Sequence, residues 1–374
     1  MKSKVLLHGM HRSKNFGDVL LTQILRDHLL KNGDNELILL APREELAGVL
    51  RLRAAGISDF LASDTLILGG GGFFQRVDGP LGSLKAIMRY ALPLLLAQIL
   101  GKRTAIIGAG AAAMPRGWLD FLFKRIVKGC DMIAVRDQAS FDYITALLGS
   151  DAVGKIHRVS DLAFSVEQCW LGEEERAWAA DVIRNLGTSR VLGIHLSEPP
   201  SANPSYEEIA ALLESHLALQ PDTGVLLLED HPVGPIQQAA AQAELQRRLP
   251  NSEVLIVPYP GVERLAALLA SMDAVLTTKL HVALCAASMG TMPFAVAKHR
   301  KNLASFADIG IVSSCCLLDE ADSDQIAAIV SSFVRHEGAL IVDNDVRNRA
   351  RKALELASAI TQASGDECKL DHSA

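Results

Sequence analysis

Short, continuous apolar runs alternate with longer helix-like stretches along this chain, and this pattern is typical of a parallel sheet covered by helices on both faces. In the first half, the predicted strands are Lys4–His8, Glu36–Leu40, Thr65–Leu68, Thr104–Ile107 and Met132–Val135. The predicted helices between them include Val19–Lys31, Ser83–Leu100 and Gln138–Leu148. The first of these helices carries apolar side chains at i, i+3 and i+4 spacing, so we expect one of its faces to be buried.

The same alternation begins again after residue 188, which predicts a second sheet. Its expected strands are Val191–Leu196, Gly224–Glu229, Glu253–Val257, Ala274–Thr277 and Pro293–Ala297. The expected helices between them are Tyr206–Leu219, Pro235–Leu249, Val262–Ser271 and Val282–Ser288. With 374 residues, the chain is long enough for two domains of roughly 100–200 residues each.

The predicted fold class is therefore α/β, with two Rossmann-like domains. The expected limits are a first domain over 1–165, a bridging segment over 166–188, a second domain over 189–340, a C-terminal helix over 341–363 and a loose tail over 364–374. The bridging segment is placed at a charged, helix-forming stretch, Gly172–Asn185, because this stretch separates the two strand patterns.

Composition excludes several classes of protein. The formal net charge of −6 gives no overall field that favours nucleic acid, although a local basic pocket for a small anion remains compatible with it. The six cysteines form no CxxC pair, so their spacing suits neither a zinc site nor a disulfide framework. Reduced thiols and the absence of a signal-peptide pattern before Val5 predict a cytoplasmic protein.

The longest apolar run lies within Tyr90–Leu100. It is too short to span a bilayer, which needs about 20 residues. We expect it to form a core helix of the first domain, and a helix that lies at a membrane interface is the alternative.

Polar and glycine-rich residues that follow an apolar strand are the first candidates for a binding site, because ligands bind at the carboxyl ends of strands in open α/β sheets. The first such cluster contains Asn15, Gly17 and Asp18, before and at the start of the first helix. Asn15 and Asp18 are candidates for hydrogen bonds to substrate hydroxyls. In the alternative interpretation, Asp18 does no more than cap the helix and complement its dipole.

Two glycine-rich segments also follow predicted strands. Gly70, Gly71 and Gly72 come after Thr65–Leu68, and Gly108 and Gly110 come after Thr104–Ile107. Glycines let a backbone approach a ligand closely and present N–H donors to it. The spacing matches neither GxGxxG nor a phosphate-binding loop with its Lys-Ser/Thr ending, and a plain turn is the alternative.

Arg136 follows the fifth predicted strand, where a guanidinium group can bind an anion with two hydrogen bonds. In the alternative interpretation, Arg136 pairs with a nearby carboxylate and Asp137 caps the helix that begins at Gln138.

Three polar clusters follow strands of the second half. They are Glu229-Asp230-His231-Pro232, Thr277-Thr278-Lys279-Leu280-His281 and Lys298-His299-Arg300-Lys301-Asn302. Cations at a strand end beside a helix N-terminus favour anion binding, and a solvated charge run is the alternative for the last cluster. Packing alone does not explain Lys279 and His281 between a buried strand and an Ala-rich helix.

The chain resembles the polysaccharide pyruvyltransferases. Residues 273–310 read DAVLTTKLHVALCAASMGTMPFAVAKHRKNLASFADIG, similar to that family's strand, Ser/Thr, Arg-Leu-His, Ala/Gly-rich helix, Gly-x-Pro, second strand and Lys before a Phe/Gly ending. Four further segments resemble the family in the same order: Asn15-Phe16-Gly17-Asp18, Leu68–Phe73, Val135–Ser140 and Ser160–Phe164. Lys279 stands where Arg is common, which replaces a two-pronged donor by a point charge, and Leu162 stands where Pro is common.

The resemblance implies a fold like that of the two-Rossmann (GT-B) glycosyltransferases, with two domains facing a central cleft and a final helix that crosses back to the first domain. It implies transfer of a pyruvyl group from phosphoenolpyruvate to a sugar of a cell-surface polysaccharide or its precursor, giving a ketal. The expected partners are phosphoenolpyruvate and a glycan acceptor, lipid-linked or free, with no metal and no cofactor. The expected location is the cytoplasm or the inner face of the membrane, with at most peripheral membrane contact.

On this interpretation, the predicted donor-binding residues are Lys279, Lys298, Arg136 and Thr278. His281 is the predicted general acid, because imidazole titrates near working pH, and Asp18 is the predicted base or hydroxyl anchor. The acceptor or cleft residues are predicted to be Asn15, Gly17, Gly70, Gly71, Gly72, Gly108, Gly110 and His231.

Two other classes of function fit the same pattern. A nucleotide-sugar-dependent glycosyltransferase of this architecture would use the same C-terminal cations on a diphosphate. A non-catalytic glycan- or metabolite-binding protein would keep the fold without the chemistry, and the combination of His281, two lysines and Asp18 argues against it.

Overall fold

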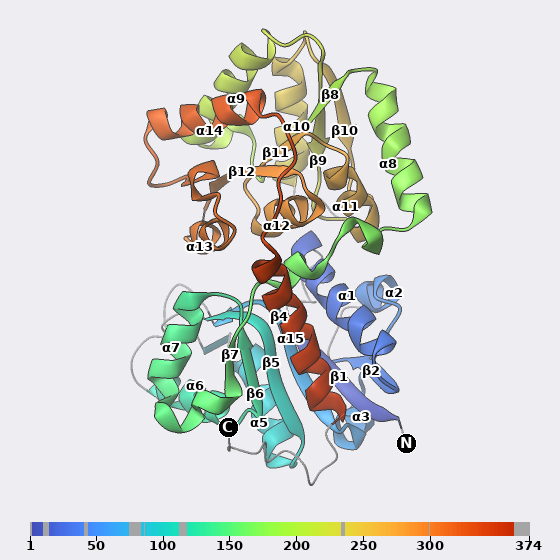
Figure 1. Cartoon of the computed structure of the whole chain (residues 1–374), viewed down its shortest axis with the longest axis vertical. Coiled ribbons are helices and arrows are strands. Elements are labelled where there is room, and N and C mark those ends of the chain that lie inside the picture. Colours follow the sequence, from blue (N-terminus) through green and yellow to red (C-terminus); the bar gives the residue numbers. More distant parts are fainter. Residues whose placement is uncertain are drawn as a thin grey trace. The chain divides into compact units, whose positions relative to one another are not determined.

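A computed structural model of the chain describes residues 2–9, 15–40, 44–74, 84–85, 87–111, 118–232, 236–298 and 300–362. The chain divides into two compact units. The first comprises Met1–Ser13, Asp18–Ser165 and Arg347–Ala374, and the second comprises Lys14–Gly17 and Val166–Val346. Each unit is built on one parallel sheet with helices packed against it, so the predicted α/β fold with two parallel-sheet domains is confirmed (Figure 1).

The first unit contains a seven-stranded sheet in the order β3-β2-β1-β4-β5-β6-β7. Its strands are β1 (Ser3–Gly9), β2 (Asn35–Leu39), β3 (Arg53–Ala54), β4 (Thr65–Phe74), β5 (Arg103–Ala111), β6 (Met132–Val135) and β7 (Ile156–Arg158). Its helices are α1 (Phe16–Lys31), α2 (Glu44–Val49), α3 (Ile57–Ala62), α5 (Leu92–Ile99), α6 (Trp118–Lys128), α7 (Gln138–Leu148) and α15 (Asn344–Gln362). A π-helical turn, η1 (Ile87–Ala91), precedes α5, and the short 3-10 turns are η2 (Ser150–Lys155) and η3 (Leu162–Ser165).

The second unit contains a six-stranded sheet in the order β10-β9-β8-β11-β12-β13. Its strands are β8 (Arg190–His195), β9 (Thr223–Leu228), β10 (Glu253–Val257), β11 (Ala274–Thr277), β12 (Met292–Ala297) and β13 (Cys315–Leu317). Its helices are α8 (Glu173–Leu186), α9 (Pro204–Leu217), α10 (Ile236–Arg248), α11 (Val262–Ala270), α12 (Leu280–Met289), α13 (Lys301–Asp308) and α14 (Ser323–Arg335). Three 3-10 turns complete it: η4 (Gln168–Trp170), η5 (Pro200–Ala202) and η6 (Val312–Ser314).

The central strands are buried on both faces. All residues of β9 and β11 are buried, and so are the seven residues 104–110 of β5. Successive side chains of a strand point to opposite faces, so a run of consecutive buried residues requires cover on both sides of the sheet. The continuous apolar runs in the sequence therefore have a direct structural cause.

The helix at Glu173–Leu186, α8, groups with the second unit. Arg264 of α11 forms an ion pair with Glu174 at 2.8 Å, and its guanidinium lies 5.4 Å from the centre of the Trp178 ring. The charged stretch that we predicted as a bridge therefore packs within one sheet unit, with its acidic first turn beside Arg264.

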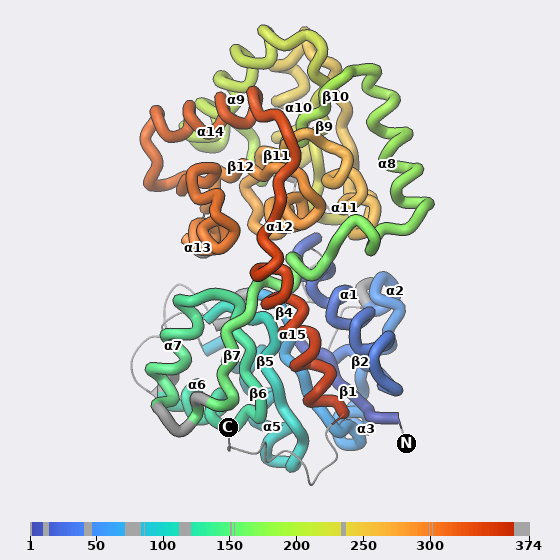
Figure 2. Tube along the Cα trace, viewed as in Figure 1, coloured from blue at the N-terminus to red at the C-terminus, as the bar shows by residue number. Residues whose placement is uncertain are grey.

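The last helix, α15, contributes its residues from Arg347 onward to the first unit. Arg349 donates to the Ser160 hydroxyl at 3.1 Å, and Gln362 donates to the Asn32 carbonyl at 2.8 Å. Figure 2 shows α15 lying among the elements of this unit, which are built largely from the N-terminal half of the chain.

The apolar run Tyr90–Leu100 covers the last two residues of η1 and the whole of α5. Leu94 and Ala97 are buried against the sheet, whereas Leu96, Ile99 and Leu100 are 45%, 71% and 49% exposed. The predicted core helix is therefore buried on one side and has an exposed apolar side. No helix in the described residues combines the length and the apolar composition that a membrane span requires.

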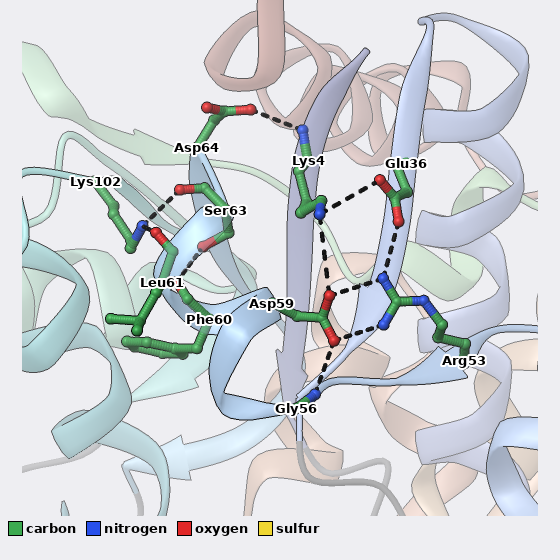
Figure 3. A network of polar contacts seen from close by, with 10 residues as sticks. All are labelled: Lys4, Glu36, Arg53, Gly56, Asp59, Phe60, Leu61, Ser63, Asp64 and Lys102. Carbon is green, nitrogen blue, oxygen red and sulfur yellow. Dashed lines mark hydrogen bonds and ion pairs between the residues drawn. The ribbon is translucent and has the colours of Figure 1, made fainter.

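A network of charges holds α3 at the amino edge of the first sheet (Figure 3). Arg53 of β3 donates to Asp59 of α3 at 2.8 Å and to Glu36 of β2 at 2.9 Å. Lys102, which directly precedes β5, donates to the carbonyls of Leu61 at 2.7 Å and Ser63 at 2.6 Å. These contacts fix a helix that is only six residues long and has no buried residue of its own.

Candidate active site

The strand order of the second sheet reverses between β8 and β11. In an open parallel sheet, the carboxyl ends of the strands at such a reversal form the usual ligand site. Thr278 and Lys279 directly follow β11, and Lys298 directly follows β12, which pairs with β11. Three of the predicted donor-binding residues therefore lie on neighbouring strand ends of one sheet.

Hydrogen bonds fix the loop that joins β11 to α12. The Thr278 hydroxyl lies 2.7 Å from that of Ser197, which follows β8, and the Thr278 N–H donates to the His195 carbonyl at 3.2 Å. The Lys279 N–H donates to the Thr277 hydroxyl at 3.0 Å. The loop is thus tied to the neighbouring strand, and α12 begins at a defined position with Lys279 as its N-cap.

Asp230, which lies just beyond the end of β9, is buried beside Lys279. Its carboxylate lies 3.9 Å from Lys279 Nζ and 3.4 Å from His195 Nε2. Burial acts to raise the pKa of Asp230, but its interactions with His195, Lys279 and Gln238 outweigh burial and hold the pKa below its usual range. A carboxylate that favours its charged form therefore faces the ammonium group of Lys279.

The segment that opens α1 packs against the same edge of the second sheet. The Phe16 N–H donates to the Asp230 carbonyl at 2.8 Å, and Gly17 lies against His281. A Cβ atom at Gly17 would lie 2.2 Å from Nδ1 and 2.4 Å from Cγ of the imidazole ring. Because no side chain fits in that space, Gly17 is required for steric reasons, and the Asn15–Asp18 motif reaches the Lys279–His281 motif through it.

Gly17→Ala is therefore expected to destabilise the chain by about 1–3 kcal/mol, since the added methyl group would lie 2.5 Å from the His281 Cβ, which no rotation of that side chain moves away. Thermal unfolding measures the effect. Gly48→Ala is the matched control, because a Cβ there meets nothing within 4 Å and it also lies in a helix. An equal effect of both substitutions would contradict the close contact with His281.

His281 is the second residue of α12 and is partly exposed. The first N–H groups of a helix have no partner within the helix and favour an anion. His281 therefore lies at a helix end that favours an anion, two residues after Lys279 in the chain.

Lys298 contacts the segment that follows β8. Its Nζ forms an ion pair with Glu198 and lies 5.7 Å from the centre of the ring of buried Tyr206. Both lysines therefore have a carboxylate neighbour, Asp230 for Lys279 and Glu198 for Lys298. Lys279 and Lys298 are 41% and 35% exposed, so an anionic ligand can reach each ammonium group.

Asn15 is the residue that caps α1, because its Oδ1 accepts from the Gly17 N–H at 3.0 Å. Asp18 lies inside the first turn of the helix and is 7% exposed. At this position the negative charge of Asp18 complements the helix dipole, which agrees with that part of the alternative interpretation. Asp18 directly follows Gly17 in the chain and groups with the first unit.

The two predicted glycine loops lie inside strands. β4 runs to Phe74 and β5 to Ala111, so the predicted strand ends at Leu68 and Ile107 were wrong. Glycine is needed within these strands because the backbone has positive φ angles at Gly70, Gly71 and Gly108. The pairing register with the neighbouring strand also shifts near these residues. Gly72 lies within β4 as well.

These glycines make room for side chains of the protein itself. A Cβ at Gly70 would lie 2.7 Å from Cβ of Leu21 on α1, and one at Gly108 would lie 2.9 Å from Cγ of Leu162. A Cβ at Gly110 would lie 3.1 Å from the Arg136 guanidinium. Helix packing therefore accounts for Gly70, and side-chain packing accounts for Gly108 and Gly110, without a ligand.

Arg136 is buried and pairs with Asp161, with Nη1 2.9 Å from Oδ2. Asp137 accepts from the Ser140 N–H at 2.8 Å and caps α7. This arrangement matches the alternative interpretation of the segment, because the guanidinium already has an internal carboxylate partner. A donor-binding role for Arg136 stays a prediction.

Asp230 and His195 are the residues of this edge that sequence reasoning missed. The sequence indicates the cluster Glu229–Pro232 and predicts His231 as its site residue, whereas the carboxylate that faces Lys279 belongs to the preceding residue, Asp230. His195 is the last residue of β8 and is fully buried. Its position at a strand end is the only sequence signal that it belongs to the site. The segment Gln75–Gly82, which follows the glycine-rich segment in the sequence, and His299 lie outside the described residues.

No group of three or more potential metal ligands occurs in the residues that the structure describes.

A family model for polysaccharide pyruvyl transferase matches residues 15–299, which is most of the chain. The chain belongs to the polysaccharide pyruvyl transferase family. The match begins at the Asn15 cap and ends just after Lys298, so it includes every residue of the edge described above. No curated protein sequence matches this family member.

Several solved structures share the fold of this pyruvyl transferase family member. A putative UDP-N-acetylglucosamine 2-epimerase from Listeria monocytogenes aligns with a TM-score of 0.61 at 12% identity, covering 97% of this chain and 98% of that one. The UDP-GlcNAc 2-epimerase from Neisseria meningitidis, bound to UDP-GlcNAc, aligns with a TM-score of 0.60 at 10% identity, covering 95% and 99%. The corresponding enzyme from Methanocaldococcus jannaschii gives 0.61 at 15% identity, covering 95% and 99%. These likenesses show a GT-B-like fold.

Proposed function

We propose that this family member transfers a pyruvyl group from phosphoenolpyruvate to a sugar, forming a ketal on a cell-surface polysaccharide or its precursor. The observation that supports the proposal most is the contact of Gly17 with His281. It joins the two ends of the family-matched region at one strand edge, beside the N-terminus of α12 and the Lys279 ammonium.

Lys279, Thr278 and Lys298 are the proposed donor-binding residues. Phosphoenolpyruvate carries a carboxylate and a phosphate, which need two cationic positions, and the neighbouring ends of β11 and β12 supply one lysine each. In the ligand-free chain, Asp230 and Glu198 hold these ammonium groups. The dianionic phosphate competes with each carboxylate, and the first amides of α12 add donors for it.

The chemistry requires two additions to the same carbon. His281 donates a proton to the methylene carbon of phosphoenolpyruvate while a sugar hydroxyl forms a bond to the adjacent carbon. A second hydroxyl then attacks that carbon, the carbon–oxygen bond to phosphate breaks, and inorganic phosphate leaves. Each hydroxyl loses one proton, and Asp18 is the proposed base or anchor for the acceptor. Holding both substrates in fixed positions supplies much of the rate.

The acceptor is proposed to be a glycan, either free or lipid-linked, that is modified in the cytoplasm or at the inner face of the membrane. The family supports a polysaccharide acceptor, and we propose that segments such as Gln75–Gly82 select the specific sugar.

Asp18→Asn is expected to leave thermal stability within about 1 kcal/mol of the wild type, because Asn15 supplies the cap and the charge–dipole interaction of an acidic first-turn residue is worth no more than this. The same substitution is expected to impair transfer if Asp18 is the base or a charged anchor, because an amide neither accepts the hydroxyl proton nor carries a charge. Unfolding and phosphate release, measured on the same preparation, check the two parts. Full turnover in a stable variant would show that Asp18 has a structural role in α1 and no role in transfer.

Ligand-induced thermal stabilisation separates this proposal from a nucleotide-sugar glycosyltransferase. Phosphoenolpyruvate at a hundred times its Kd is expected to add about 2.7 kcal/mol to the unfolding free energy. UDP and UDP-sugars at the same concentration are expected to have no effect. Stabilisation by UDP alone would favour the glycosyltransferase. If neither ligand acts on a well-folded chain, donor binding as proposed is excluded.

A further inference from the structure

An apolar pocket of about 750 Å³ opens on the first unit between α3 and the helical segment η1–α5. Its walls include Ile57 and Phe60 of α3, Met88 of η1, and Leu92 and Leu96 of α5. Neither the fold nor the proposed active site on the second sheet explains this pocket, because no predicted or proposed catalytic residue lines it.

Exposed apolar side chains continue outward from the pocket. Ile57 and Leu61 on α3 are 84% and 60% exposed, and Met88 and Ile99 on η1 and α5 are 50% and 71% exposed. Half of the exposed large apolar side chains in the described residues belong to α3, η1, α5 and Leu100 directly after α5. Leu92, Leu96 and Ile99 follow helical spacing, so they form one stripe along α5. Such a concentration marks an interaction surface.

The charged side chains that line the pocket are positive. They belong to Lys85 and Arg89, and both side chains are exposed. In the part of the chain that is described, neither forms an ion pair with a carboxylate. No acidic residue lines the pocket. In the sequence, residues 79–119 contain no Asp or Glu but five Lys or Arg, although the whole chain has a net charge of −6.

We propose that this surface docks the first unit on an anionic lipid bilayer, with Ile57, Ile99 and the pocket taking up acyl chains while Lys85 and Arg89 contact the phosphate headgroups. An exposed apolar stripe flanked by cations is the composition of segments that lie in the membrane interface. The Arg53–Asp59 and Lys102 contacts hold α3 rigidly, so Ile57 and Leu61 are presented without a further ordering cost. Docking of a second protein or a second copy of the chain would not explain why the charged residues that line the pocket, Lys85 and Arg89, are both positive.

Co-sedimentation of the full chain with vesicles tests this proposal. The chain is expected to bind vesicles that contain phosphatidylglycerol and to bind pure phosphatidylcholine vesicles much more weakly. Lys85→Glu/Arg89→Glu is expected to weaken binding to the anionic vesicles by about thirtyfold. Ile57→Ser and Ile99→Ser are each expected to weaken it by about tenfold.

Ile341→Ser is the matched control, since Ile341 belongs to the second unit and is 89% exposed. It should leave vesicle binding unchanged, and all of these variants should keep wild-type thermal stability and phosphoenolpyruvate binding, which separates this test from that of the proposed function. Equal binding to both vesicle types, no binding to either, or equal losses in Ile341→Ser and Ile99→Ser would overturn the proposal. So would a dimer in light scattering that Ile57→Ser disrupts.

Discussion

Replacing His281 by alanine is expected to lower the rate of pyruvyl transfer by roughly a hundred- to ten-thousandfold, which is the typical contribution of a general acid. Binding of phosphoenolpyruvate should be largely retained, because the Lys279 ammonium and the amides of α12 do not depend on the imidazole. Steady-state phosphate release gives the rate, and calorimetric titration of the donor gives its Kd.

The contact with Gly17 makes a stability control necessary for this variant. The alanine retains Cβ, which lies 2.5 Å from the position that a methyl group on Gly17 would take, and removes only the ring. We therefore expect a folded protein, and thermal unfolding verifies this. Full turnover of a folded His281→Ala chain would show that the proton comes from another group.

Replacing Lys279 by alanine is expected to weaken phosphoenolpyruvate binding by about ten- to a hundredfold, because a charge-assisted contact contributes roughly 1.5–3 kcal/mol. The variant also leaves the buried Asp230 carboxylate without its lysine. Lys279→Arg restores the charge and should restore binding, since Arg is common at this position in the family and offers two parallel donors.

Donor titration of Lys279→Ala, Lys279→Arg and Asp230→Asn separates the possible causes. If Lys279 binds the donor directly, the alanine variant loses affinity, the arginine variant keeps it, and Asp230→Asn frees the ammonium and does not weaken binding. Unchanged donor affinity in Lys279→Ala would place the anion site elsewhere.

The strand pattern could be predicted well because parallel strands buried on both faces must be continuously apolar. Met132–Val135, Glu253–Val257 and Ala274–Thr277 were predicted with the limits that the structure has. The short β3, β7 and β13 were missed, since two or three residues at a sheet edge carry too little apolar sequence. β4 and β5 were cut short because glycines usually end strands, whereas here they admit Leu21 and Leu162.

The site was predictable only in part. Strand-end position indicated Thr278, Lys279 and Lys298, and the structure places all three just after the ends of adjacent strands. Position along the sequence gives no side-chain partners, so the pairing of Arg136 with Asp161 and of Lys279 with Asp230 could not be derived. The contact of Gly17 with His281 joins residues from opposite ends of the matched region, and only the folded chain brings them together.

Phosphate release from phosphoenolpyruvate, screened against glycans extracted from cell envelopes, tests the central claim most directly. We expect release that depends on a glycan acceptor, with one pyruvyl group gained by the glycan for each phosphate released, and with both signals lost in His281→Ala. Acceptor-dependent release of UDP from a UDP-sugar, with phosphoenolpyruvate left intact across the whole panel, would contradict the proposed transfer.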